Sequence, residues 1–556
     1  MLRLALAFVT GVGCGSATTA PADSGTTTGF SPEVGAAPAS DVSSSAPAPV
    51  DPAVAFYDEA VVQDVRLTIA QTDALAMLAA LPERIDVHGT LRWGEIVVPD
   101  VAVRFKGNSS AMSGDWKRGY VIDTDTYVDG QRFLGLEHMA FDNGIQFGGL
   151  WSEVLVNRLL RAEGVVATRA NHARLTVNGE AMGVFVNVER IDKKFLKKHF
   201  AENDGNLYKC NLGGPGDNLV DQGDDPLAYA TAFEVKTNDL TADWTDVAAL
   251  ARFLRDEPDE TFAAALAARF DLDSFLTTTA LLAIVGAFDQ YTGFNPHNYY
   301  LYFDPTTGRA TYLAHDLDVA FADNAFGTVP VIDGWNVAWP VPRTPRPLLE
   351  RILRDDTLRA RYQAQAQRLL DGPLAPAVLD AALDELYARI GEELPDDPSH
   401  GIRVTVPTDT DAAGVIASMK AFIKTRTARA LADLANPPTE PPSPVFVGAP
   451  PDRGPTPGDL VDGAPTHLVG EVVDGTVSLS WDVAPAAAAS IVQRCTGLGC
   501  DTFVNHIGLP IDQGHAVIDT AVTSGTTYRY RVYALGPTRR GGAGTIPTAP
   551  IDVVLP

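Results

Sequence analysis

A largely apolar run followed by a β-hairpin lies in the middle of the chain and limits what the sequence can fold into. The run from Phe275 to Phe288 predicts a buried helix. Two alternating segments, NYYLYF and RATYLA, are joined by the turn sequence DPTTG and predict the hairpin. A buried helix beside a hairpin indicates an α+β domain.

Polar side chains that suit a metal ion flank the predicted hairpin. Asn298 stands at its start, and Asp316 and Asp318 follow its end in the sequence HDLD. Because a hairpin brings its two ends together, Asn298 and Asp316 are expected to lie close in space. Their oxygens are ligands that Mg²⁺, Mn²⁺ or Ca²⁺ prefers. Asp289, before the hairpin, is expected beside this site without binding the metal.

The order of these residues is the order found in protein kinases. There, a helix is followed by a catalytic Asp, a metal-binding Asn, a hairpin and a metal-binding Asp. The letters here are not HRD and DFG. The alternative interpretation is that these are turn and cap residues, which Asp and Asn often are. That alternative is the stronger one for any single residue, whereas four residues in this order favour a site.

Candidates for phosphate binding occur earlier in the chain. A predicted strand ends in Lys106 and runs into a turn with Asn108 and Ser109, whose donors could hold phosphate. Lys106 or Lys117 could pair with phosphates, and each could equally be a solvated lysine. Glu153, on the predicted helix LWSEVLVNRLLRAEG, is a candidate partner for such a lysine or else part of a solvated face.

The overall charge and the N-terminal sequence bear on partners and location. The chain carries 43 basic and 70 acidic residues, a net charge of −27, which argues against nucleic acid or an anionic membrane as a partner. Residues 1–14 resemble a bacterial lipoprotein signal that ends at Cys14, with a plain signal peptide as the alternative. We therefore expect an exported protein, extracellular or anchored to the envelope by a lipid on Cys14. Residues 15–55, rich in small residues and Pro, predict a disordered tether.

The C-terminal part has a different composition. A Pro-rich linker at 437–463 precedes a segment of short predicted strands at 464–556. The alternation in VSLSW and YRYRVYA is typical of a β-sandwich and resembles fibronectin type III domains. Cys495 and Cys500 are close enough in sequence to bridge a small loop, which export permits. Cys210 is left as a single thiol and is expected to be buried or weakly exposed.

The motifs RFKGNSS, VNGEAMGVFVNVERID, HNYYLYFDPTTG and AHDLD resemble those of the CotH kinase family, the spore coat protein H type. The resemblance covers roughly residues 56–436 and implies an atypical protein-kinase-like domain that uses ATP with Mg²⁺ or Mn²⁺. It implies that Asp289 is the catalytic Asp and that Asn298 and Asp316 bind the metal, with Asp318 completing the motif.

Two functions are consistent with this reading. The first is a kinase that transfers phosphate from ATP to secreted or surface proteins. The second is a catalytically inactive kinase-like surface protein that serves adhesion or envelope structure. The expected export counts against the first function, because ATP is scarce outside the cytoplasm. The presence of Asp289, Asn298 and Asp316 favours it.

Overall fold

The structure is a computed structural model of the 556-residue chain. It describes residues 51–81, 83–107, 117–144, 148–211, 213–214, 216–294, 296–323, 330–341, 345–394, 411–442, 465–482, 489–500, 504–505, 511–512, 515–520, 522–535 and 548–556. The predicted signal, nearly all of the predicted tether and most of the predicted linker lie outside the described residues. No helix in the described part of the chain is long and apolar enough to cross a membrane.

The first described elements form a closed β-barrel with the strand order β1-β2-β3-β4-β5-β7-β6. Adjacent strands of the barrel pair antiparallel except for β1 and β6, which pair in parallel and close the barrel. Alternation explains the two faces of β1, because Val65, Leu67 and Ile69 are buried inside while the residues between them are exposed. The strands are β1 (Gln63–Ile69), β2 (Val87–Trp93), β3 (Ile96–Lys106), β4 (Gly119–Asp123), β5 (His138–Asp142), β6 (Ala170–Val177) and β7 (Glu180–Val188).

Two helices lie within the connections of the barrel strands, and a third follows the last of these strands. They are α1 (Gln71–Ala80), α3 (Gly149–Ala162) between β5 and β6, and α4 (Lys193–His199) after β7. The helix α3 is buried along most of its length and packs on β6 and β7. The element that carries Glu153 is therefore a core helix.

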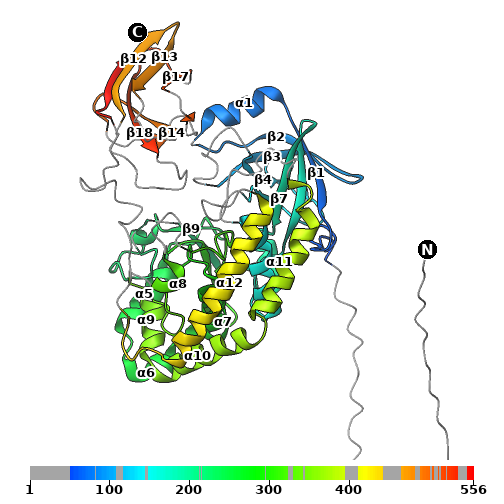
Figure 1. Cartoon of the computed structure of the whole chain (residues 1–556), viewed down its shortest axis with the longest axis vertical. Coiled ribbons are helices and arrows are strands. Elements are labelled where there is room, and N and C mark those ends of the chain that lie inside the picture. The colour runs from blue at the N-terminus through cyan, green and yellow to red at the C-terminus, as the bar shows by residue number, and fades with distance from the viewer. Residues whose placement is uncertain are drawn as a thin grey trace, which may run out of the picture. The chain divides into compact units, whose positions relative to one another are not determined.

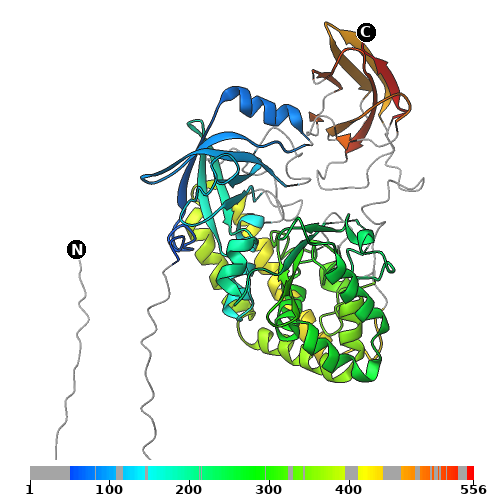
Figure 2. The same ribbon diagram turned by 180° about the vertical axis from the view of Figure 1, so that it is seen from behind.

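A second sheet and a group of helices follow the barrel. The sheet has the order β11-β10-β8-β9, with β8 (Asn206–Cys210), β9 (Phe233–Val235), β10 (Tyr299–Asp304) and β11 (Arg309–Ala314). The helices are α5 (Thr245–Asp256), α6 (Asp259–Arg269), α7 (Leu272–Val285), α8 (Val331–Gly334), α9 (Pro347–Arg354), α10 (Asp356–Asp371), α11 (Pro376–Ile390) and α12 (Ala412–Ala435), with a 3₁₀ turn η1 at Pro226–Tyr229. The helices α11 and α12 lie side by side, and α7 packs on α10 (Figures 1 and 2). The mixed helix and strand content confirms the predicted α+β class.

The C-terminal segment forms two antiparallel sheets around one core, as expected for a β-sandwich. One sheet contains β12 (Thr466–Val473), β13 (Thr476–Asp482) and β17 (Ala516–Asp519). The other contains β14 (Ala489–Thr496), β15 (Val504–Asn505), β16 (Ile511–Asp512), β18 (Thr527–Leu535) and β19 (Ile551–Val554). Trp481 from the first sheet and Tyr530 from the second share the core. The likeness to fibronectin type III remains a prediction.

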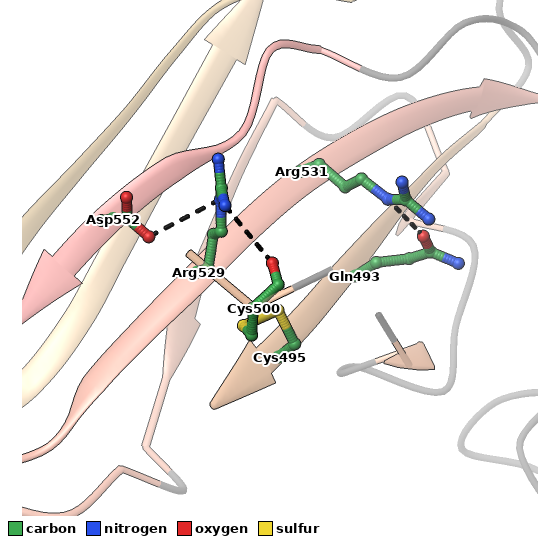
Figure 3. The surroundings of a disulfide bond; sticks show 6 residues. All are labelled: Gln493, Cys495, Cys500, Arg529, Arg531 and Asp552. Carbon is green, nitrogen blue, oxygen red and sulfur yellow. Dashed lines mark hydrogen bonds and ion pairs between the residues drawn. A yellow bond between two sulfur atoms is a disulfide. The ribbon is translucent and has the colours of Figure 1, made fainter. Parts of the chain in front are cut away.

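The expected disulfide between Cys495 and Cys500 is present, and Cys210 is buried as a free thiol. Figure 3 shows Arg529 beside the bridge, where it donates to the carbonyl of Cys500 at 3.4 Å and faces Asp552. The bridge thus closes a short loop at the end of β14.

The central buried helix has different ends from those predicted. The sequence predicts Phe275 to Phe288, whereas α7 starts at Leu272 and stops before Gly286. Gly286 has φ +73°, a left-handed conformation that ends a helix at little cost only when no Cβ is present. A Cβ there would also meet the ring of Phe422 at 2.7 Å. The chain leaves α7 three residues early and reaches Asp289 as a loop.

A buried arginine holds the end of α7 in place. Arg426 on α12 is 1% exposed, and its guanidinium donates to the carbonyls of Ala283 (2.8 Å), Val331 (2.8 Å) and Trp335 (2.7 Å). Burial lowers the pKa of Arg426 to about 10, so the side chain stays charged at neutral pH. It therefore satisfies carbonyls that would otherwise lack partners in the core.

Arg426→Met is expected to lower the free energy of unfolding by about 3 kcal/mol or more, because several buried carbonyls lose a charged donor. Urea denaturation followed by circular dichroism measures this change. Lys424→Met, on the exposed side of the same helix, is the matched control and is expected to stay within about 0.5 kcal/mol of the wild type. Equal stability of the two variants would contradict the role given to Arg426.

Candidate functional site

The β10–β11 hairpin places Asn298 and Asp316 next to each other, as its pattern predicts. Tyr299 lies opposite Ala314 in the register, and the amide of His315 donates to the carbonyl of Asn298 at 2.9 Å. Asn298 and Asp316 have φ values of +56° and +57°, which are uncommon for residues with a Cβ. Strained backbone of this kind is often kept at functional sites. The two residues also line one cavity.

Three carboxylates meet just beyond the hairpin. Oxygen atoms of Glu153, Asp316 and Asp318 lie within 4.8 Å of one another. Glu153 comes from α3, and the other two follow β11. A fourth carboxylate, that of Asp142 at the end of β5, joins them through Lys106, whose Nζ contacts Asp142 and lies 3.3 Å from Asp316. Lys106 therefore pairs with the two aspartates and not with Glu153, the partner considered from the sequence.

The first turn of α3 fits closely against the segment that carries Asp318. A Cβ at Gly149 would lie 3.0 Å from the Cβ of Asp318, so the helix begins with the smallest residue where this segment passes. The hydroxyl of Ser152 donates to the backbone carbonyl of Asp318 at 2.5 Å. These contacts fix the backbone of Asp318 against the helix that carries Glu153.

Burial and mutual repulsion shift the ionisation of this cluster. Burial, with help from Asp316 and Asp142, raises the pKa of Glu153 to about 8. Burial and the neighbouring carboxylates also raise the pKa of Asp318 well above its ordinary value. Burial opposes ionisation of Asp316, but Lys106 and the other positively charged neighbours together outweigh it and lower the pKa of that carboxyl. Burial would lower the pKa of Lys106, yet Asp142 and Asp316 raise it, so the lysine stays charged.

The cluster fits a divalent cation of the Mg²⁺ or Mn²⁺ type. Glu153 is 2% exposed, and its Oε2 has no hydrogen-bond partner among the described residues. A buried carboxylate oxygen without a donor is costly unless a cation binds it. Hard oxygen ligands in this number suit these ions. Glu153, Asp316 and Asp318 are the residues that would hold the ion. Asn298, which the sequence predicts as a ligand, shares a cavity lining with Asp316, and its Nδ2 donates to Asp289.

A strongly basic cavity opens beside Asp316. Its volume is about 320 Å³, and Asn298, His297 and His315 are among its lining residues. Burial and Lys209 push the pKa of His315 well below its ordinary value, so this histidine is neutral. The lining contains the cations Arg84, Arg104, Lys106, Arg190, Lys209 and Lys236, against the two carboxylates of Glu234 and Asp316. An excess of positive charge beside a metal-binding cluster suits a phosphate-rich ligand.

Asp289 lies near the start of the loop that joins α7 to the hairpin. Its Oδ2 accepts a hydrogen bond from Nδ2 of Asn298 at 3.2 Å, and Nε2 of His297 lies 3.4 Å away. The loop itself is held by Arg346, which is fully buried and donates to the carbonyl of Tyr291 at 2.6 Å. The expectation that Asp289 sits beside the Asn298 site is met in this geometry.

The other predicted phosphate-binding residues are placed differently. Asn108 and Ser109 lie outside the described residues. Lys117 is 4% exposed, and its Nζ lies 4.8 Å from the centre of the Phe185 ring. Lys106 lines the cavity, whereas Lys117 is not among the residues that line it. Of the two lysines considered, Lys106 is the one at the site.

Comparison with known proteins identifies the family. The family described as CotH kinase protein matches residues 103–429. The chain belongs to the CotH kinase family. Membership points to an atypical kinase that needs ATP and a divalent metal. No curated protein matches the chain.

Solved structures match short parts of the chain. An Fn3-like protein from Clostridium thermocellum is 27% identical, with 17% of this chain and 96% of that chain covered, at a TM-score of 0.15. A structure titled titin kinase and its flanking domains is 16% identical, with 17% of each chain covered and the same TM-score. The twitchin kinase region from C. elegans is 14% identical, with 19% of this chain and 17% of that chain covered, at a TM-score of 0.14. At these scores the likenesses carry no argument.

Several residues of the site in this CotH family member were not predicted. Asp142 pairs with Lys106, and Arg190 and Lys209 line the cavity without an ion-pair partner among the described residues. Their sequence surroundings resemble ordinary strand ends, so no local signal marks them. Gln290 directly follows Asp289, and this position next to a predicted site residue is the signal that could have indicated its role.

Gln290 connects the Asp289 loop to the backbone of Asp316. Its Nε2 donates to the carbonyls of His315 at 2.8 Å and Asp316 at 3.3 Å, and its Oε1 accepts from the hydroxyl of Tyr312 at 3.4 Å. The side chain is 1% exposed. These bonds support the left-handed backbone of Asp316 and thus the direction of its carboxylate.

Gln290→Leu is expected to weaken Mn²⁺ binding about tenfold or more, because the backbone of Asp316 loses its support. Calorimetric titration of Mn²⁺ measures the loss. Gln365→Leu, a glutamine on α10 outside the site, serves as the control. Unchanged Mn²⁺ affinity in a folded Gln290→Leu variant would count against the positioning role.

The raised pKa of Glu153 predicts how stability depends on pH in metal-free protein. Between its ordinary pKa of 4.5 and its folded value of about 8, the native state binds more protons than the unfolded state. Stability is therefore full below about pH 4.5 and falls as the pH rises towards 8. We expect a loss of about 3.5 kcal/mol between pH 5 and pH 8, because the slope is at most about 1.4 kcal/mol for each unit and flattens near both pKa values.

Urea denaturation in the presence of a chelator measures this loss. Glu153→Gln is expected to flatten the pH dependence and to be more stable than the wild type at pH 8. Glu260→Gln, an exposed carboxylate on α6, is expected to keep the wild-type profile. A Glu153→Gln variant with an undiminished pH slope would show that Glu153 does not titrate in this range.

Proposed function

We propose that the chain is an exported atypical kinase of the CotH type that transfers phosphate from ATP to secreted or surface proteins with a divalent metal. The observation that carries this proposal is the meeting of two charge patterns at Asp316. On one side lies the carboxylate cluster with the unpartnered oxygen of Glu153. On the other lies the basic cavity. In a metal–nucleotide complex, the cation complements the carboxylate cluster and the phosphates complement the basic cavity.

In the proposed reaction Lys106 binds a phosphate of the nucleotide while it remains held by Asp142 and Asp316. Its two ion pairs restrict the Nζ to one place at the edge of the cavity. Arg190 and Lys209 offer further positive charge on the wall. When bound, a divalent ion at Glu153, Asp316 and Asp318 offsets the negative charge of the transferred group.

Asp289 is proposed to act on the acceptor. The oxygen of the acceptor hydroxyl forms a bond with the γ-phosphorus, the bond to the β-phosphate oxygen breaks, and ADP leaves. Asp289 takes the proton of that hydroxyl. Asn298 and His297 hold its carboxylate, which fixes the direction from which the acceptor approaches.

The proposed place of this reaction rests on the N-terminal sequence. The short basic and apolar regions before Cys14 support export, and a lipid on that cysteine would be the contact with the membrane. The C-terminal sheets would then serve as a spacer or an adhesive module.

Asp316→Asn is expected to abolish metal-dependent binding of ATP, because the residue belongs to both the carboxylate cluster and the cavity. Asp289→Asn is expected to bind ATP within a few-fold of the wild type and to lose phosphate transfer by about 10² to 10⁴-fold. Calorimetric titration of ATP with Mg²⁺ or Mn²⁺ measures binding. Transfer of labelled γ-phosphate to the protein itself and to casein measures activity.

Asp239→Asn removes an exposed carboxylate elsewhere and should change neither measurement. Equal metal-dependent ATP binding by Asp316→Asn and the wild type would refute the proposed site. ATP binding without transfer by the wild type would favour the inactive surface protein instead.

A further inference from the structure

A second hollow lies on the outer face of the barrel, formed by strands β6, β1 and β2. Its volume is about 580 Å³, larger than the cavity beside Asp316. Arg66, Arg92, Thr68, Thr90, Thr176 and Gly179 line it. None of the described residues that line this hollow is acidic, although the whole chain has a net charge of −27.

The strand register brings the two arginines of the hollow together. Arg66 on β1 lies directly opposite Arg92 on β2, and Thr176 on β6 lies on the other side of Arg66. Directly opposed residues have their Cβ atoms roughly 5 Å apart, and like charges in such pairs are unfavourable. Neither guanidinium has an ion-pair partner in the described part of the chain. The nearest acidic residue along β1, Asp64, pairs with Arg174 instead.

The rim of the hollow is held in a fixed position. The turn at Asn178 and Gly179 is tied to β1, because Oδ1 of Asn178 accepts from the amide of Ile69 at 2.8 Å and the amide of Asn178 donates to the carbonyl of Leu67 at 2.9 Å. Thr68 and Thr90 face each other in the next row of the register. Hydroxyl groups therefore stand beside both guanidinium groups.

We propose that this hollow binds a phosphate dianion carried by a phosphorylated protein segment. Two guanidinium groups offer two positive charges and several planar N–H donors, and a phosphate monoester matches both the charge and the donor pattern. A single carboxylate would leave one charge unmatched. An anionic membrane is disfavoured because the rest of the protein repels it.

The identity of the phosphorylated ligand rests on the proposed kinase function. A kinase that holds a phosphorylated protein, either its own product or a substrate phosphorylated elsewhere, keeps the remaining acceptor groups of that protein near its active site. Their local concentration there is raised. Binding of phosphate by the hollow itself needs neither nucleotide nor metal, so it is measured separately from transfer.

The test uses the full chain without nucleotide or metal and compares Arg66→Gln/Arg92→Gln with the wild type. The probe is a fluorescent Gly/Ser-rich peptide with one phosphoserine, followed by anisotropy, together with the same peptide unphosphorylated and inorganic phosphate as competitor. We expect the double variant to bind the phosphopeptide at least tenfold more weakly, and the unphosphorylated peptide to bind neither protein. Lys197→Gln/Lys424→Gln removes two exposed positive charges elsewhere and should stay within twofold of the wild type.

Thermal unfolding shows whether the double variant is correctly folded. The double variant should melt at or above the wild-type temperature, because it removes a like-charge pair, and phosphate should stabilise the wild type more than the double variant. Equal phosphopeptide binding by the double variant and the wild type would overturn the proposal. Binding of phosphatidylglycerol vesicles that depends on the two arginines would overturn it in favour of a lipid surface. Phosphopeptide binding in a protein without transfer activity would keep this site and reject the kinase function.

Discussion

Four carboxylates that repel one another surround one lysine, and the elements around them must hold these side chains together. Asp142, Glu153, Asp316 and Asp318 come from three separate parts of the chain, and Lys106 is the cation that bridges two of them. Such a cluster costs stability in the absence of a counterion. The surrounding elements therefore hold the residues together by other means, chiefly the close fit of α3 against Asp318.

The same region depends on two buried arginines. Arg346 and Arg426 donate to backbone carbonyls on either side of Asp289, one in the loop after it and one in the helix before it. A charged donor satisfies several carbonyls in a short irregular segment where a helix or sheet ladder cannot. The backbone on both sides of Asp289 thereby has side-chain donors for its carbonyls.

The sequence predicts those parts of the molecule that depend on local pattern. The hairpin, the adjacency of Asn298 and Asp316 and the disulfide all follow from turn residues and short spacing. The end of α7 was missed because apolar content continues past Gly286, while the helix stops where the backbone turns left-handed. Glu153 and Asp142 could not be assigned to the carboxylate cluster, since their places depend on how α3 packs and on how β5 is positioned in the barrel. Arg66 and Arg92 face each other only through a register that no local pattern reveals.

Closure of the barrel by the parallel β1–β6 pair has a consequence for how the chain folds. The contact between Ile69 and Asn178 spans 109 residues, and β6 follows α3 in the chain. A parallel closing pair of this kind requires a large loop to be ordered first, which gives a high contact order and slow folding. Since α3 lies inside that loop, Glu153 reaches its place only with barrel closure. The carboxylate cluster also needs Asp316 and Asp318, which follow β11, so it forms only when segments far apart in the sequence have come together.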